Sequence, residues 1–270
     1  IQCRACEPAC PSGVPYGRLI EATMAQVKNR RKMGLLARAT ANLSLKHILP
    51  HQNRLAFLVG ALRLYQRSGL QQALRKSHLL QLVPGRLAEV ETSLPHIPST
   101  SFHPRGQVVP AKRTKKLRDQ PAPADGAKSR VALLSGCVMP LVHGPQMDAV
   151  VRVLSRNGCE VVVPRDQVCC GALNTHVGDL DTARDLARRN IDAFLASDVD
   201  AIVVASAGCG IRMKEYGHLL RHDPQYAAAG RGGRAPLLWV SASRSFRQLW
   251  RILLLWVSAS RSFRQLWRIL

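Results

Sequence analysis

Three cysteines near the amino end have the spacing of iron ligands. Cys3, Cys6 and Cys10, with Pro11 directly after them, read C-x2-C-x3-C-P. This is the end of the run C-x2-C-x2-C-x3-C-P, whose first cysteines place thiolates on different irons of one [4Fe–4S] cluster and whose last ligates a second cluster. The pattern therefore predicts a further cysteine immediately before Ile1. It also predicts that the three cysteines here are divided between two clusters.

Two other uses of clustered cysteines remain as alternatives. A zinc knuckle would need a second cysteine pair further along, and no such pair follows Cys10. A disulfide framework would need an oxidising compartment, but no signal peptide precedes these cysteines and 270 residues can bury a core without disulfides. The zinc alternative also leaves the C-P ending of the motif unexplained, and the disulfide alternative is set aside.

The middle of the chain alternates between strand and helix patterns. Short β-branched runs precede or follow amphipathic stretches of helical period. The predicted strands are 131–135, 159–163 and 201–205, and the predicted helices are 145–156, about 180–195 and a last one that ends near 220. This order predicts an α/β fold with a parallel βαβαβα unit and right-handed crossovers.

Four more cysteines follow these three strands. Cys137 comes after the first strand, Cys169 and Cys170 after the second, and Cys209 after the third. Carboxyl ends of parallel strands are where open α/β sheets bind ligands, so these thiols are expected to meet at one edge of the sheet and to hold a further cluster. The alternative is that these cysteines are buried structural thiols, but that alternative leaves the adjacent pair Cys169 and Cys170 unexplained. Cys159 differs from the four, because it opens a strand and is expected to pack as a small hydrophobe.

Glycines flank all four of these cysteines. They are expected to let the backbone turn sharply and approach a bulky cofactor. They are Gly136, Gly171, Gly208 and Gly210.

The residues before this unit read as helices followed by a linker. Apolar residues recur at helical spacing from Gly17 to Pro50 and again from about Leu55 to Val83. Residues 94–130 are rich in Pro, Lys and Arg and predict a linker with at most one short strand at Val108–Val109.

Charge is distributed unevenly along the chain. Residues 1–130 hold 22 Lys and Arg against 6 Asp and Glu, residues 131–223 hold 9 against 11, and residues 224–270 hold 8 against none. Aromatic residues make up only 5% and do not interleave with the basic runs, which argues against nucleic-acid binding. The basic flanks fit an anionic membrane surface or an acidic partner subunit. No apolar run approaches the roughly 18 residues of a membrane span, so membrane contact is expected to be peripheral.

Several stretches together are similar to a known family. They are Cys3-Arg-Ala-Cys6-Glu-Pro-Ala-Cys10-Pro-Ser-Gly-Val-Pro-Tyr16-Gly, Cys137, Cys169-Cys170-Gly171, Ser206-Ala-Gly-Cys209-Gly and Lys214-Glu-Tyr-Gly-His218-Leu-Leu. Over residues 1–223 the chain resembles the iron–sulfur subunits of bacterial glycolate oxidase. That family combines a two-cluster ferredoxin-like segment with cysteine-rich CCG domains, which also occur in heterodisulfide reductase B, lactate-utilisation and anaerobic glycerol-3-phosphate dehydrogenase C proteins.

The resemblance implies an electron-transfer subunit, here a fragment, of an oxidoreductase that is not active alone. A flavin-containing partner would oxidise glycolate, and this chain would pass electrons through [4Fe–4S] clusters toward the quinone pool. A further flavoprotein-like subunit is implied, and the location would be cytoplasmic, peripheral on the inner face of the cytoplasmic membrane. No catalytic residue is expected in this chain. Another CCG-domain redox subunit and a non-redox basic membrane-binding scaffold are the alternatives.

The chain departs from the family pattern in three places. The first ferredoxin motif and the first cysteine of the second are missing. The CCG pattern ends in C-x2-C, but Arg212 stands three residues after Cys209. If a further side chain completes the cysteine ligand set, the candidates are His143, His176 and His218. A lone histidine, however, is more often a surface or capping residue. A second CCG domain is missing, and in its place the 17 residues LLWVSASRSFRQLWRIL occur twice, at 237–253 and 254–270.

The repeat is expected to be a non-native tail that does not pack on the βαβ core, because two identical copies cannot form a solenoid.

Together, the patterns divide the chain into five expected parts. The expected parts are a partial ferredoxin-like motif (1–17), a helical region (18–93), a basic linker (94–130), a CCG domain (131–223) and the tail (224–270).

Overall fold

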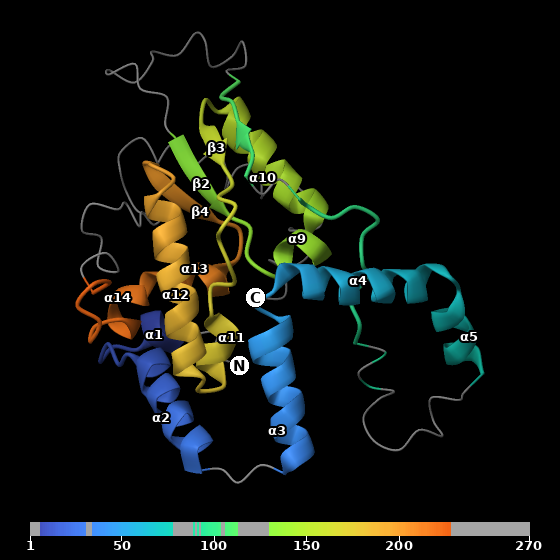
Figure 1. Cartoon of the computed structure of the whole chain (residues 1–270), viewed down its shortest axis with the longest axis horizontal. Coiled ribbons are helices and arrows are strands. Elements are labelled where there is room, and N and C mark those ends of the chain that lie inside the picture. The colour runs from blue at the N-terminus through green and yellow to red at the C-terminus, as the bar shows by residue number, and fades with distance from the viewer. Residues whose placement is uncertain are drawn as a thin grey trace.

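Figure 1 shows the protein as a computed structural model, which describes residues 6–30, 34–77, 89, 91, 93–103, 106–112 and 130–227. Outside these residues lie Cys3, residues 78–83 of the second predicted helical stretch, the segment 113–129 of the predicted linker and residues 228–270 of the predicted tail. The amino-terminal elements are α1 (Cys6–Ala9), α2 (Tyr16–Arg30), α3 (Leu35–Asn42), the π-helical turn η1 (Leu43–Ile48), α4 (Gln52–Arg67) and α5 (Leu70–Lys76). The elements that follow are β1 (Val108–Val109), β2 (Arg130–Leu134), α9 (Met139–Val142), α10 (Gly144–Arg156), β3 (Glu160–Val162), α11 (Ala172–His176), α12 (Leu180–Leu195), β4 (Ala201–Val204), α13 (Ala207–Lys214) and α14 (Tyr216–Leu219).

The sheet has the strand order β1-β3-β2-β4, and β2 pairs in parallel with both β3 and β4. Ala132 of β2 lies opposite Val162 on one side and Ile202 on the other. The chain therefore crosses from β2 to β3 in one direction and returns past β2 to β4. This confirms the α/β fold and the parallel βαβαβα unit.

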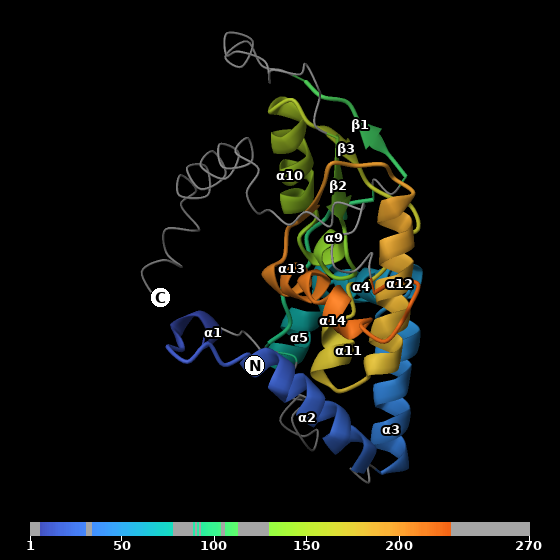
Figure 2. The same cartoon turned by 90° about the vertical axis from the view of Figure 1, so that its left-hand side faces the viewer.

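Helices cover both faces of the sheet, as Figures 1 and 2 show for α10 and α12. Successive strand residues point to opposite faces. Leu133 and Val161 pack with Met147 and Leu154 of α10, and the other face packs against α12. The core on that second face includes Ala132, Leu134, Val162, Ala183, Ala187, Ile191 and Phe194.

The predicted linker contributes to this unit instead of only connecting it. Val108–Val109 forms β1, which pairs antiparallel with β3 and makes the sheet mixed. Ile97 and Phe102 are buried, and Phe102 packs with the α10 core. A composition rich in proline and basic residues does not report single buried apolar side chains, so this packing was not predicted.

The amino-terminal helices are shorter than the periodic pattern suggested. The second stretch divides into α4 and α5 at Ser68–Gly69, where Gly69 adopts a left-handed φ of 78°. Many of its apolar residues are exposed, among them Phe57 and Leu64 at 78% and 70%. In Figure 1, α4 and α5 extend away from the sheet. No helix in the described parts of the chain has the length and hydropathy of a membrane span.

Candidate functional site

The structure brings Cys137, Cys169, Cys170 and Cys209 together at the carboxyl edge of the parallel strands. Cys137 follows β2, the cysteine pair lies in the loop after β3, and Cys209 lies in the first turn of α13 after β4. Because β2 lies between β3 and β4, the three loops converge. Cys169 and Cys170 are each only 3% exposed, whereas Cys137 and Cys209 are half-buried.

Two of the four flanking glycines have the conformation that the sequence led us to expect. Gly136 and Gly171 adopt left-handed φ angles of 68° and 78°. At Gly171 a Cβ atom would lie 3.3 Å from the Cα of Ala183, so this residue also lets the cysteine loop approach α12 closely. Gly208 and Gly210 lie inside α13 without a left-handed φ, and the expectation of a sharp turn there was wrong.

The four sulfur atoms form a chain of interacting thiols. Sγ of Cys137 and Sγ of Cys169 share a hydrogen bond at 3.4 Å. That hydrogen bond is the main cause that lowers the pKa of Cys169 and raises the pKa of Cys137. Cys170 interacts with both Cys169 and Cys209, which raises the pKa of Cys170 and lowers that of Cys209. Raised and lowered pKa values therefore alternate along the four thiols, because adjacent thiolates would repel one another.

Asn190 and Tyr216 fix the main chain of the cysteine pair by hydrogen bonds. Asn190 Nδ2 donates to the carbonyl oxygen of Cys169 (3.0 Å) and to the Tyr216 hydroxyl (3.1 Å), and its Oδ1 accepts from the backbone N–H of Val168 (2.9 Å). The Tyr216 hydroxyl donates to the carbonyl oxygen of Cys170 (3.0 Å). Both side chains are fully buried, so these hydrogen bonds form away from water and fix the loop.

Gln167 joins the same loop to the end of β2. Its Oε1 accepts from the backbone N–H of Ser135 (2.7 Å), and its Nε2 donates to the carbonyl oxygens of Leu133 (3.2 Å) and Pro164 (3.0 Å). Sequence reasoning did not single out Gln167, Asn190 or Tyr216. The sequence did offer one signal for this hydrogen-bond network, because Asn190 is a polar residue in the core-facing stripe of α12.

Leu49, which follows η1, packs against the cluster of the buried residues Val168, Cys169 and Leu186. Cys137 packs against the same cluster. Aliphatic carbon therefore surrounds Cys169 on this side. Asn174 of α11 donates from Nδ2 to the carbonyl oxygen of Leu45 (3.3 Å), which holds η1 against the same domain.

Arg212, at the position where the family pattern has cysteine, belongs to a buried ion-pair group. Its Nη1 lies 2.8 Å from Glu21 of α2 and its Nη2 lies 2.8 Å from Glu215, and Arg212 is only 3% exposed. Arg18 lies 3.8 Å from Glu215. This side chain is therefore engaged in ion pairs that join α2 to α13.

Two further contacts join α2 to the segment between α11 and α12. Lys28 Nζ lies 2.9 Å from Asp179. Between the ion pairs, a Cβ atom at Gly178 would collide with the main chain of Met24 and Ala25. Residues 18, 21, 25 and 28 share one helix face, so α2 packs on the domain through a mainly polar face. Its apolar residues Leu19 and Val27 are exposed instead.

The remaining predicted residues lie apart from the four thiols or outside the described chain. Cys159 is buried in the core beside α10, as expected for a small hydrophobe. Cys6 is exposed at the start of α1, Cys10 follows that helix, and Cys3 is not among the described residues. His143 is exposed between α9 and α10, and His218 lies 3.2 Å from Arg221.

Cys10 has its own local electrostatic environment. Backbone N–H groups of Val14, Ser12 and Gly13 point toward its sulfur and lower its pKa, the contribution of Val14 being the largest. Metal ligation requires the thiolate, so the turn after Pro11 favours the ligating form of this residue.

The donor set at the sheet edge has the chemistry of an iron–sulfur cluster site. Among the described residues, no three Cys, His, Asp or Glu side chains are arranged to hold one metal ion. A cluster does not require such convergence, because its cysteines bind separate irons. Four thiols, two with lowered pKa, at a partly buried strand edge match that chemistry.

Family models match two parts of the chain. The model described as "Glycolate oxidase iron-sulfur subunit, linker region" matches residues 36–94. The model described as "Cysteine-rich domain" matches residues 131–214 and so contains all four thiols of the sheet edge.

Two curated relatives are named as iron–sulfur subunits of glycolate oxidase. The chain is 41% identical over 228 residues to the "Probable glycolate oxidase iron-sulfur subunit" of Bacillus subtilis, which covers 84% of this chain and 49% of that protein. It is 30% identical over 234 residues to the glycolate oxidase iron-sulfur subunit of Escherichia coli, 86% of this chain and 49% of that one.

A more partial similarity extends to lactate utilization protein A of Bacillus cytotoxicus, at 33% over 99 residues, 37% of this chain and 41% of that protein. No solved structure matches the chain significantly. The chain spans about half the length of the glycolate oxidase relatives that it matches. These matches show that the chain carries the linker region of glycolate oxidase iron–sulfur subunits and a cysteine-rich domain, and that it is similar to those subunits over most of its own length.

Proposed function

We propose that this chain is an electron-transfer part of a glycolate oxidase and that Cys137, Cys169, Cys170 and Cys209 hold a [4Fe–4S] cluster. The observation that carries the proposal is the meeting of four thiols from three strand ends at one edge of the sheet. A cluster held there would supply one-electron transfer. We further propose that Cys3, Cys6 and Cys10 contribute ligands to two other [4Fe–4S] clusters, for which this chain holds only part of the ligand sets.

The protein's own residues would hold and shield the cluster. Asn190 and Tyr216 fix the backbone of the cysteine pair, so the two thiolates would keep a constant orientation. Leu49 and Leu186 lie in the same apolar cluster as Cys169 and would exclude water from that side of the cluster site. Restricted solvent access and fixed backbone dipoles are the means by which proteins tune cluster potentials.

The proposal includes partners and domain organisation. Electrons would come from a flavin-containing subunit that oxidises glycolate, with a further flavoprotein-like subunit in the complex, and would leave toward quinone. Residues 131–223 would form the CCG domain, with 1–17, 18–93, 94–130 and 224–270 as the ferredoxin-like motif, helical region, linker and tail. The longer match to glycolate oxidase subunits than to lactate utilization protein A supports glycolate as the substrate of the complex.

Anaerobic reconstitution with iron and sulfide tests the cluster. We expect a broad visible absorption band near 400 nm, bleached by dithionite, and about four irons per chain. A Mössbauer or EPR spectrum then identifies the cluster type. Stoichiometric zinc binding with no visible band would show that the cysteines serve a different metal.

We also propose that the chain associates peripherally with the inner face of the cytoplasmic membrane. Helix α4 exposes Phe57, Ala61 and Leu64 on one face, with Arg54 and Arg67 toward its two ends. Each basic residue near an anionic surface contributes about 1 kcal/mol, and salt screens that attraction beyond about 10 Å at 0.1 M. Binding to vesicles with 30 mol% phosphatidylserine should therefore be lost in high salt. Binding that resists salt would indicate a hydrophobic anchor instead.

A further inference from the structure

Ser206 stands directly before α13, the helix that carries Cys209 in its first turn. Its φ of −120° and ψ of 126° are the extended angles of a helix N-cap residue, and its carbonyl oxygen accepts from the N–H of Gly210 at 3.0 Å. An N-cap side chain is ordinarily directed toward the second and third residues of its helix. The third residue of α13 is Cys209, so the backbone brings the Ser206 hydroxyl close to this cysteine.

The Ser206 hydroxyl binds the sulfur of Cys209 instead of capping the helix. The side chain of Ser206 makes no capping hydrogen bond to the first turn of α13. The Cys170 thiol lowers the pKa of Cys209 most, and a hydrogen bond from the Ser206 side chain lowers it further, against the effect of burial. A hydroxyl that favours the thiolate is the donor in that bond. The spacing is that of a capping box, with cysteine at the position where Glu or Gln usually stands.

Backbone groups donate to two other sulfurs of the site. The N–H of Val138 donates to the sulfur of Cys137, and the N–H of Gly171 donates to the sulfur of Cys169. These donors belong to the main chain, and Gly171 has a left-handed φ of 78° that another residue would strain. Ser206 donates from a side chain instead. Its hydrogen bond can therefore be removed by substitution while the backbone donors stay in place.

We propose that Ser206 raises the reduction potential of the sheet-edge site by donating its hydroxyl proton to the sulfur of Cys209. This inference rests on the proposed [4Fe–4S] cluster, of which Cys209 would be a ligand. One-electron reduction adds negative charge to a cluster and its sulfur ligands, and a hydrogen-bond donor stabilises that charge. Ser206 and Cys209 are both half-buried, so the hydrogen bond acts in an environment less polar than water. Ser206 thereby makes the site a better acceptor of electrons.

Redox titration of the full chain after iron–sulfide reconstitution, followed by visible absorption and EPR, tests this inference. At a fixed solution potential, Ser206→Gly and Ser206→Ala should each lower the ratio of reduced to oxidised cluster about tenfold, which is about 59 mV for one electron. Ser206→Thr keeps the hydroxyl and should bring the ratio back to within about twofold of the unsubstituted chain. The iron content should be the same in all four chains.

Comparison of the glycine and alanine variants separates the hydrogen bond from helix capping. Glycine is a good N-cap residue and alanine is a poor one, whereas both lack a hydroxyl. A hydrogen bond to sulfur predicts equal shifts in potential for Ser206→Gly and Ser206→Ala. A capping role predicts a larger effect for Ser206→Ala, and urea unfolding of the two chains measures that capping effect separately. A shift in potential confined to Ser206→Ala would overturn the proposal.

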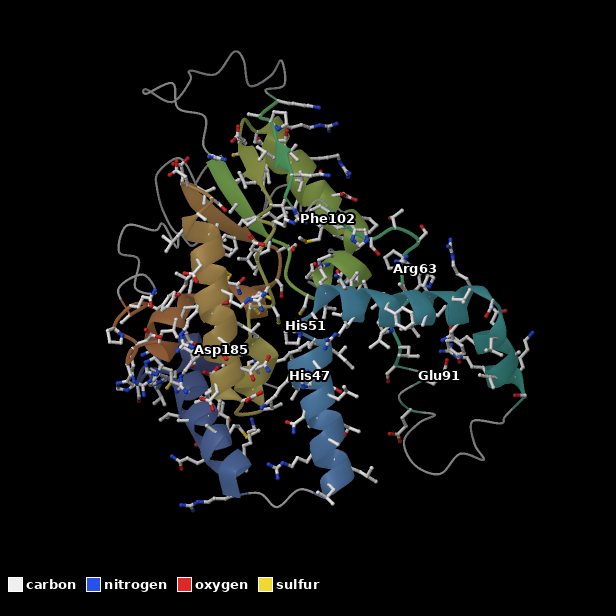
Figure 3. All side chains as sticks on the ribbon, viewed as in Figure 1. His47, His51, Arg63, Glu91, Phe102 and Asp185 are labelled. Carbon is white, nitrogen blue, oxygen red and sulfur yellow. The ribbon has the colours of Figure 1, made fainter. Side chains whose placement is uncertain are left out.

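Two control variants change groups that lie away from Cys209. Ser197 is also half-buried, but its hydroxyl donates to the carbonyl oxygen of Ala193 at 2.7 Å, before β4 begins at the opposite edge of the sheet. Asp185, labelled on α12 in Figure 3, is exposed and pairs with Arg188 at 2.6 Å. Ser197→Ala removes a hydroxyl, and Asp185→Asn removes a full charge that solvent screens. Each should change the reduced-to-oxidised ratio by less than about twofold.

The outcomes separate this inference from the proposed function. Equal potentials of the unsubstituted chain and Ser206→Gly, with full iron in both, would overturn the role of Ser206 and leave the proposed cluster intact. A tenfold change in either control variant would also overturn it, because the potential would then respond to any substitution. If the unsubstituted chain itself took up no iron, the proposed function would fail, and the role of Ser206 would fail with it.

Discussion

Cys169→Ala is expected to abolish cluster binding at the sheet edge. Cys169 contacts both Cys137 and Cys170, is nearly fully buried, and has its carbonyl oxygen held by Asn190. Removing its sulfur takes away the thiol that lies between Cys137 and Cys170 in the chain of four. Iron content and the visible band after reconstitution should fall by at least tenfold.

Cys159→Ala is the matched control for that experiment. Cys159 is equally buried, but it lies in the apolar core beside α10 instead of among the four thiols. The control should retain the full iron content and lose about 1 kcal/mol of stability or less, because only one small apolar group is removed. If both variants lost iron alike, the loss would reflect general unfolding, and the assignment of Cys169 as a ligand would have no support.

Arg212→Met should be the most destabilising substitution among the described ion pairs. The guanidinium group is buried between Glu21 and Glu215, so its removal leaves two nearly buried carboxylates without their shared cation. Breaking a buried ion pair from one side costs about 3–5 kcal/mol. We expect a loss of about 3 kcal/mol in the free energy of unfolding by urea, with faster hydrogen exchange in α2.

Arg184→Met gives the comparison for Arg212. Arg184 pairs with Asp181 at 2.9 Å within α12, but Asp181 is almost fully exposed. Such a pair contributes about 0.5 kcal/mol or less. Replacing all three buried charged residues, as in Glu21→Gln/Arg212→Met/Glu215→Gln, should recover part of the lost stability, since no unpaired buried charge remains. Equal effects of Arg212→Met and Arg184→Met would show that α2 does not depend on the buried ion pairs.

The sequence predicted the parallel unit well because its signals are local. Each strand is a short β-branched run and each long helix has a clear apolar stripe, and α12 begins and ends at the predicted residues 180 and 195. Cysteines placed directly after three such strands must reach the same sheet edge once the strands are parallel. Their meeting therefore follows from topology, and the Cys137–Cys169 contact of 3.4 Å agrees with it.

The amino-terminal helices were less predictable because their partners are remote in sequence. Leu19 and Val27 belong to the apolar residues at helical spacing, yet the structure exposes both and directs Glu21 toward Arg212. Helical periodicity identifies an apolar stripe but not what that stripe meets. Only a contact across 191 positions shows why a carboxylate in α2 is buried.

The sequence by itself determined the fold class, the order of strands and helices and the identity of the cysteines at the sheet edge, because backbone periodicity and residue type are properties of short segments. The tertiary structure decided three other features. It packed Leu49 against the cluster of Val168, Cys169 and Leu186, it joined Asn190 and Tyr216 to the main chain of the cysteine pair by hydrogen bonds, and it enclosed Arg212 between two carboxylates. Each of these depends on side chains from separate elements meeting in the folded chain, and burial then determines how strongly their hydrogen bonds and charges act.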